Sequence, residues 1–310
     1  MKHVQDLAVE AVGKVLNDQK RPLKERFRAL FTLRNLGGIC AIECIAKCFD
    51  DPSALLRHEL AYCLGQMKDP AAIPTLISVL KDVNQEAIVR HEAAEALGAI
   101  GCPEALGILE QFTVDTETVV VETCQLALKK IAWLQSPESK EAKFEDSPYS
   151  SVDPAPPLLE DRSVEELKAM LLDVSKPLFD RYRAMFALRD CGSRDAVLAL
   201  SEGLKCPSSA LFRHEVAYVL GQVQEEAATP YLKEVLEDKS EVGMVRHECA
   251  EALGSIASQE CMDILKRFEN DEERLVRESC EVALDMCEYE NSHEFQYANT
   301  LLQVQPEALI

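Results

Sequence analysis

The stretch LLRHELAYCLGQ, Leu55 to Gln66, returns later in the chain as LFRHEVAYVLGQ, Leu211 to Gln222. Nine of the twelve positions are identical. A second stretch, VRHEAAEALGAI from Val89, returns as VRHECAEALGSI from Val245 with ten of twelve positions identical. Both copies lie 156 residues apart. The chain is therefore an internal duplication, and a repeat architecture has to be considered before any other fold.

Each half also contains a shorter repeat. His58 and His91 are 33 residues apart, and so are His214 and His247. The same register extended outward finds weaker copies in both halves. These copies are ERFRALFTLRNLG from Glu25, DRYRAMFALRDCG from Asp180, VVETCQLAL from Val120 and VRESCEVAL from Val276. The pattern predicts four units of about 31–33 residues in each half, and eight units in all.

Each unit is predicted to form two amphipathic helices. In PTLISVLKD from Pro74 and EAIVRHEAAEALGAIG from Glu86, apolar residues recur at i, i+3, i+4 and i+7. A unit this short cannot bury its own apolar stripe, so neighbouring units must stack into an all-α solenoid. Glycines are expected to close the second helix of the inner units. They are Gly65, Gly98, Gly221 and Gly254.

The repeats divide the chain into two pseudo-symmetric halves, residues 1–135 and 163–288. Between them, residues 136–162 hold five of the fourteen prolines, and seven acidic against three basic residues, without helical periodicity. We expect this segment to be an unstructured acidic linker. The tail, residues 289–310, is polar and aperiodic at first, and we expect it to be loosely held.

Composition limits the classes of function. The 310 residues include 33 basic and 54 acidic ones, a net charge of −21. This charge argues against nucleic acid and favours a cationic partner. The N-terminus has no apolar signal region, no apolar run could span a membrane, and the twelve cysteines are expected to be reduced thiols. We expect a soluble monomer in the cytoplasm, with the nucleus as a second location.

Histidine followed by glutamate occurs in register in all four inner units. Four of the six histidines lie in these pairs, which are His58-Glu59, His91-Glu92, His214-Glu215 and His247-Glu248. The outer units have other residues in the same slots, namely Phe27-Arg28, Glu122-Thr123, Tyr182-Arg183 and Glu278-Ser279. The scaffold therefore forms without the pairs, which indicates that they serve function. By the same comparison, the arginine before each histidine is structural, because Arg26, Arg181 and Arg277 precede slots without histidine.

The paired residues are candidate metal ligands. Equivalent positions of stacked repeats lie on one face, so His58 should be close to His91, and His214 close to His247. Two histidines and a carboxylate are a ligand set of non-haem iron, with open positions for dioxygen. If the halves face each other, they form a dinuclear site with one metal in each half. Imidazole and carboxylate also suit zinc or manganese, so ligand type alone leaves the metal open.

From about Leu23 to Cys287 the chain resembles the deoxyhypusine hydroxylase family. The resemblance rests on eight HEAT-like helical-hairpin repeats in two halves, an acidic linker, and His-Glu pairs in the inner repeats. It implies a dioxygen-dependent non-haem di-iron monooxygenase with no catalytic residue beyond the metal centre. The implied partner is translation initiation factor 5A in its deoxyhypusine form. The implied iron ligands are His58, His91 and Glu92 in one set, and His214, His247 and Glu248 in the other.

The resemblance also implies a role for the remaining two glutamates. Glu59 and Glu215 correspond to carboxylates that bind the cationic substrate side chain, although as residues they could equally be metal ligands. The sequence contains no GxGxxG motif after a strand and no CxxC pair, so electrons are expected from an external reductant. Tyr62 and Tyr218 follow the pairs by one turn and either support the site or pack the core.

Two other functions fit part of the pattern. An acidic helical scaffold without metal would account for the fold and the charge, but not for the His-Glu register. A dinuclear zinc or manganese hydrolase would account for the ligands, but not for the resemblance. Metal analysis separates these functions from the di-iron enzyme.

Overall fold

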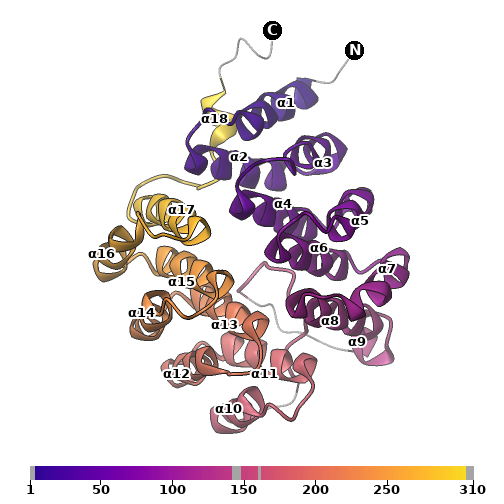
Figure 1. Cartoon of the computed structure of the whole chain (residues 1–310), viewed down its shortest axis with the longest axis vertical. Helices are drawn as coiled ribbons and strands as arrows, with labels where there is room; N and C mark the ends of the chain where they lie inside the picture. Colours follow the sequence, from indigo (N-terminus) through magenta and orange to yellow (C-terminus); the bar gives the residue numbers. More distant parts are fainter. Residues whose placement is uncertain (1–3, 142–147, 160–161, 305–310) are drawn as a thin grey trace.

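Helical hairpins stacked in chain order make up the protein (Figure 1). The structure, a computed structural model, describes residues 4–141, 148–159 and 162–304, and no strand occurs in these ranges. Successive helices pair as α1 with α2, α3 with α4, α5 with α6, and α7 with α8. The helices of this first half are α1 (Val4–Asn17), α2 (Leu23–Leu36), α3 (Gly38–Ala46), α4 (Ala54–Met67), α5 (Ile73–Lys81), α6 (Ala87–Ile100), α7 (Leu106–Gln111) and α8 (Thr118–Leu134), with the 3-10 turns η1 (Pro70–Ala72), η2 (Pro103–Ala105) and η3 (Phe112–Val114).

The second half repeats the arrangement with four more hairpins. Its helices are α10 (Val164–Leu172), α11 (Leu178–Cys191), α12 (Arg194–Glu202), α13 (Ala210–Val223), α14 (Thr229–Glu237), α15 (Gly243–Ile256), α16 (Gln259–Phe268) and α17 (Arg274–Glu290), with the 3-10 turns η4 (Gly203–Lys205) and η5 (Glu226–Ala228). Two short helices, α9 (Pro137–Glu141) and α18 (Thr300–Gln303), lie outside the hairpins. The predicted all-α solenoid of eight hairpins in two halves is confirmed.

Each half has its own apolar core. Almost all buried apolar side chains of the first core come from α1 to α8, and Val282 of α17 is its one buried member from the second half. The second core likewise includes Leu126 of α8 among residues of α10 to α17. No helix of the described residues combines the length and apolar character that a membrane span requires.

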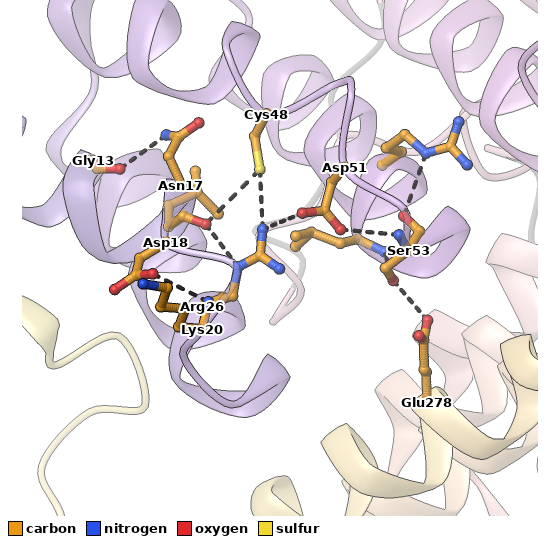
Figure 2. Close-up of polar contacts among 12 residues, drawn as sticks. Gly13, Asn17, Asp18, Lys20, Arg26, Cys48, Asp51, Ser53 and Glu278 are labelled. Carbon is orange, nitrogen blue, oxygen red and sulfur yellow. Dashed lines mark hydrogen bonds and ion pairs between the residues drawn. The ribbon is translucent and has the colours of Figure 1, made fainter.

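A ladder of buried arginines connects neighbouring repeats. Arg26 donates from Nε to the Leu16 carbonyl oxygen at 2.8 Å and pairs with Asp51 at 2.5 Å (Figure 2). Arg90 makes the same two contacts, to the Leu80 carbonyl oxygen and to Asp115. These contacts satisfy the open carbonyl end of the preceding helix, which confirms the structural role of the arginines.

The repeated glycines serve helix packing. Gly98 lies inside α6, and a Cβ added to it would be 2.8 Å from the Cβ of Ala127 on α8. The left-handed residues that end these helices come later, at Gly101 for α6 and at Lys68 for α4. The prediction that Gly65, Gly98, Gly221 and Gly254 close the helices is wrong, because all four lie inside their helices and lack a side chain so that the next helix can pass close by.

The two halves face each other through their second helices (Figure 1). At one end, α17 contacts α2 and α4, and at the other end α8 contacts α11 and α13. The chain therefore closes into a ring, in which the last repeat of each half meets the first repeats of the other half. This closure brings the inner faces of α4, α6, α13 and α15 together.

The connection between the halves is ordered in its described part. The backbone N–H of Val152 donates to Gln66 Oε1 at 2.8 Å, and Asp153 pairs with the buried Arg189 at 2.9 Å. The prediction of an unstructured linker over 136–162 is wrong for these residues. Missing periodicity does not exclude the short helix α9 at the start of this segment, nor polar contacts with both halves. The other predicted linker residues 142–147 and 160–161 lie outside the described residues.

The tail also packs on the body of the protein. Tyr297 lies between the rings of Phe31 and Tyr289, with centroids 5.9 and 5.4 Å away. The Thr300 N–H donates to Thr32 Oγ1 at 3.2 Å. The expectation of a loose tail is therefore wrong for the residues up to 304, because aromatic contacts hold it against α2. The last six residues, 305–310, lie outside the described part.

Candidate metal centre and cavity

The four His-Glu pairs lie on four equivalent helices of the inner repeats. Each pair lies in the first two turns of its helix, on α4, α6, α13 or α15. Serine side chains cap two of these helices, because Ser53 accepts from the Leu56 N–H and Ser209 from the Phe212 N–H. All eight side chains of the pairs are buried. The repeat therefore delivers the four pairs to one inner surface.

The four imidazole rings form one cluster that includes both halves. Within the halves, the ring centroids of His58 and His91 are 5.6 Å apart, and those of His214 and His247 are 5.3 Å apart. Between the halves, His58 is 5.3 Å from His247, and His91 is 5.5 Å from His214. The prediction that the histidines of each half are neighbours is confirmed, and the halves do face each other across them, which is the condition for a single composite site.

One glutamate in each half lies between two imidazoles. Glu92 Oε2 is 3.2 Å from His58 Nε2 and 3.9 Å from His91 Nε2. The second half has the same geometry, with Glu248 Oε2 at 3.2 Å from His214 Nε2 and at 3.9 Å from His247 Nε2. The structure thus brings together each predicted set of two histidines and one carboxylate.

The other two glutamates of the pairs lie beside this cluster. Glu59 Oε2 is 3.9 Å from His58 Nδ1, which is the ring nitrogen on the side opposite to Glu92. Glu215 lies equivalently on α13, and its buried Oε1 has no hydrogen-bond partner among the described residues. Both side chains line the cavity described below.

A cavity of about 730 Å³ opens beside the imidazole cluster. Helices of both halves line it, and residues 148–154 of the connection form one of its walls. His58 and His214 reach its surface, whereas His91 and His247 are fully buried. A volume of this size is typical of a site for a small molecule or an extended side chain.

Two tyrosines connect the halves inside this cavity. The hydroxyl oxygens of Tyr62 and Tyr218 are 3.0 Å apart, within hydrogen-bond distance. Gln222 Nε2 donates to the Tyr218 hydroxyl at 3.1 Å and to Ser151 Oγ of the connection at 2.8 Å. The tyrosines therefore belong to the cavity wall and tie it to the residues that bridge the halves.

Burial favours the neutral form of three of the imidazoles, those of His91, His214 and His247. It lowers the pKa of His214 to about 3 and holds the pKa values of His91 and His247 well below the ordinary range, with the neighbouring histidines adding to the effect. A neutral imidazole has a free lone pair, which is the form that binds metal ions.

The carboxyl groups are shifted in the opposite direction. Burial and the charge of Glu248 raise the pKa of Glu92 to about 8, and burial also raises the pKa of Glu248 well above its usual range. The pKa values of Glu59 and Glu215 are raised for the same reason. So many acidic groups in a buried space repel one another, and a cation among them relieves this repulsion.

Comparisons with known proteins agree with this geometry. A family model described as HEAT repeats matches residues 42–129 and 164–243, and one described as a PBS lyase HEAT-like repeat matches 245–271. The deoxyhypusine hydroxylase of Drosophila melanogaster is 60% identical over 96% of this chain and 97% of its own length. That of Homo sapiens is 59% identical over 97% of this chain and 98% of its own. The chain belongs to the deoxyhypusine hydroxylase family.

A solved structure of that family has the same fold. Human deoxyhypusine hydroxylase in complex with glycerol aligns with a TM-score of 0.89 at 59% identity, and covers 92% of this chain and 98% of its own. The expectation that the chain is an enzyme of the deoxyhypusine hydroxylase family is confirmed.

The chemistry of the clustered histidines and glutamates fits a bound metal ion. All eight ring nitrogens of the four clustered histidines are buried and lack a hydrogen-bond partner among the described residues. Buried polar atoms in native proteins nearly always have a partner. A metal ion takes one nitrogen of an imidazole, so the four Nε2 atoms that lie within 3.9 Å of Glu92 or Glu248, together with these carboxylates, are a donor set that metal ions would satisfy.

Sequence reasoning missed two further carboxylates at the centre. Glu95 and Glu251 follow Glu92 and Glu248 by three residues, line the cavity, and have pKa values raised by burial. Glu251 Oε1 is 3.5 Å from His247 Nδ1. A signal for them was present, because both glutamates recur in the duplicated AEALG motif 156 residues apart.

Proposed function

We propose that the protein hydroxylates the deoxyhypusine side chain of translation initiation factor 5A to hypusine, using dioxygen and an external reductant. The observation that carries this proposal is the composite cluster of four histidines and two carboxylates beside an acidic cavity. The names of the relatives supply the substrate. The cluster and the cavity supply the residues that would act on it.

Two iron ions would be held by ligands from both halves. The residues that would hold them are His58, His91 and Glu92 in one half, and His214, His247 and Glu248 in the other. When bound, two irons supply the electrons that activate dioxygen, a chemistry in which zinc has no part. The imidazoles of His91, His214 and His247, whose pKa values burial lowers, are ready to bind without first losing a proton.

The cavity would take the cationic side chain. Deoxyhypusine is a long polyamine-like side chain that is positively charged at neutral pH. Glu59 and Glu215 line the cavity beside the histidines, one from each half. A carboxylate that accepts from an ammonium group makes a charge-assisted hydrogen bond. The two glutamates would therefore anchor the chain and place one of its carbons beside the metal cluster.

Burial of the site serves the same reaction. His91 and His247 are 0% exposed, and the wall of residues 148–154 narrows the access of water to the cluster. Low access of water strengthens the pairing of the glutamates with the amines and limits side reactions of activated oxygen. Arrival of the ammonium groups would also hold the acidic side chains in their charged form.

Metal content of the purified protein tests the metal assignment. We expect two irons per chain in the wild type and loss of the paired centre in His91→Ala, because removing a ligand leaves one iron undercoordinated. His293→Ala is the matched control, since His293 also precedes a glutamate but is exposed in the tail. Two zinc or manganese ions would favour a hydrolase, and no metal would favour a scaffold. Full iron and full activity in His91→Ala would contradict the dinuclear assignment.

The roles of the glutamates are tested by measuring iron and substrate affinity on the same variants. Glu59→Ala and Glu215→Ala should keep iron and bind the deoxyhypusine protein about 10- to 100-fold more weakly, because a charge-assisted hydrogen bond contributes about 1.5–3 kcal/mol. Glu92→Ala and Glu248→Ala should lose iron. If the Glu59 and Glu92 variants lost iron equally, both would be ligands, and the proposed division would be wrong while the enzyme assignment stood.

A further inference from the structure

Glutamate replaces histidine in the last repeat of each half. Glu122 on α8 occupies the slot that holds His91 in the preceding repeat, and Glu278 on α17 occupies the slot of His247. These two glutamates are 156 residues apart, as are the histidines that they replace. Neither lines the cavity. The last repeat of each half thus carries a glutamate at the histidine position, and this glutamate is not one of the proposed metal ligands.

Both glutamates reach across to the other half of the ring. Ser209 Oγ donates to Glu122 Oε2 at 2.7 Å, and Ser53 Oγ donates to Glu278 Oε2 at 2.6 Å (Figure 2). The two serines are themselves 156 residues apart. Two equivalent hydrogen bonds therefore join the halves, one at each end of the ring, and we call them the two latches.

Each latch ends on a helix that carries a His-Glu pair. Ser53 caps α4, which holds His58, and Ser209 caps α13, which holds His214. Their hydroxyl oxygens accept from the backbone N–H three residues on, at 3.0 Å in both cases. Each serine is thus fixed at the start of its helix, while its hydroxyl group donates a hydrogen bond to a glutamate of the opposite half. The latch couples the position of a metal-binding helix to the last repeat of the other half.

Other contacts also set the distance between the halves, among them the hydrogen bond between the Tyr62 and Tyr218 hydroxyls. The two apolar cores meet at Val282 and Leu126, which each enter the core of the opposite half, and at the partly buried Val119 and Met244, which pack against both cores. Arg28 also pairs with Asp285 across the halves, at 2.8 Å, but Arg28 lies on α2, a helix that carries no His-Glu pair. The Tyr62–Tyr218 hydrogen bond joins α4 directly to α13, whereas each latch joins a metal-binding helix to the last repeat of the other half, so the relative position of the two half-sites depends on both kinds of contact.

We infer that Glu122 and Glu278 are positioning residues of the two-metal centre, which act through Ser209 and Ser53 to hold the two half-sites at a fixed separation. The inference rests on the proposed function, because a fixed separation of the half-sites matters only if two metal ions act together. The closing of the ring itself can be measured without metal.

The test is the double variant Glu122→Ala/Glu278→Ala in the full-length chain. This change removes both latches and leaves the serine caps in place. Glu122→Gln/Glu278→Gln is the conservative partner, because the amide oxygen still accepts from serine. Glu104→Ala/Glu260→Ala is the matched control: these two glutamates are exposed and also 156 residues apart. Arg274, which pairs with Glu278 at 2.6 Å, is exposed and stays solvated.

Two measurements separate the inference from the proposed function. Spin labels carried on non-natural amino acids at the exposed positions Val83 and Lys239 report the distance between the halves, with and without iron. Mössbauer spectroscopy of the iron-loaded protein reports the magnetic coupling of the two ions. A wild type without iron would contradict the proposed function and leave the distance measurement valid.

In the alanine double variant we expect a longer and broader distance distribution, weaker coupling between the irons, and a fall in hydroxylation of about 10-fold or more. Helix content should be unchanged, and the glutamine and control variants should match the wild type. Glu122→Ala alone should give an intermediate distance, and it decides the question if the double variant does not fold. A wild-type distance and coupling without the latches, or equal changes in the Glu104 and Glu260 control, would overturn the inference.

Discussion

Replacing Gly98 by alanine tests how closely the helices of neighbouring repeats must pack. The added Cβ would be 2.8 Å from the Ala127 Cβ and 2.9 Å from its Cα, about 0.6 Å short of the 3.4 Å at which ordinary contact begins. The nearest atoms belong to the backbone of α8 or are attached directly to it, so no flexible side chain can move aside. Either α6 and α8 separate, or both distort.

The magnitude follows from two opposing effects. Overpacking a core costs about 1–3 kcal/mol, while alanine in place of glycine inside a helix gains up to about 1 kcal/mol. Gly107→Ala is the control, because it also replaces a glycine within a helix and a Cβ there meets nothing within 4 Å. The difference between the two variants therefore reports chiefly the packing cost. We expect Gly107→Ala to be about 0.5–1 kcal/mol more stable than the wild type, and Gly98→Ala to be less stable.

Equilibrium unfolding in urea, followed by circular dichroism, gives both free energies of unfolding. Iron content is the second readout, because α6 carries His91 and Glu92 two turns before Gly98. We expect iron to fall in Gly98→Ala and to stay at the wild-type level in Gly107→Ala. If Gly98→Ala were as stable as Gly107→Ala, close approach would not be the reason for this glycine.

Three other predictions concern the metal, the wall of the cavity and one buried lysine. Chelating the metal should lower the unfolding midpoint of the wild type more than that of His91→Ala, which keeps only one full ligand set, because a ligand that binds only the folded state stabilises it. Asp153→Ala removes two contacts to Arg189, at 2.9 and 3.0 Å, so residues 148–154 should be cut by protease faster than in the wild type; an unchanged rate would contradict their docking. Lys130→Met places at position 130 the residue that the other half has in the equivalent position, Met286. Burial lowers the pKa of Lys130 from 10.5 to about 8, so its charge destabilises the folded state at neutral pH. The variant should therefore be roughly 1–3 kcal/mol more stable than the wild type at pH 7. Between pH 8 and 10.5 the unfolded wild type holds a proton that the folded state lacks, so its stability should rise with pH, and this slope should be smaller in the variant.

Most of the candidate site could be predicted because the duplication acts as an internal control. His91 and His247 stand out since the outer repeats hold Glu122 and Glu278 in the same slots. Glu95 was overlooked for the opposite reason. A glutamate in an Ala-rich helix has the composition of an ordinary solvated face, and only its position in the cavity reveals its burial.

The sequence by itself determined the helices, the eight hairpins and the alignment of the His-Glu pairs within each half. These features follow from local periodicity, since apolar spacing and a fixed repeat length specify which face of each helix is buried. The tertiary structure alone decided that the halves close into a ring, that residues 148–154 wall the cavity, and that Gly98 permits helix contact rather than ending a helix. Such contacts join residues far apart in the chain, as Ser53 and Glu278 are, and depend on the summed rotations of every repeat between them. No local sequence pattern specifies the sum of these rotations, so only the folded ring shows where the two half-sites meet.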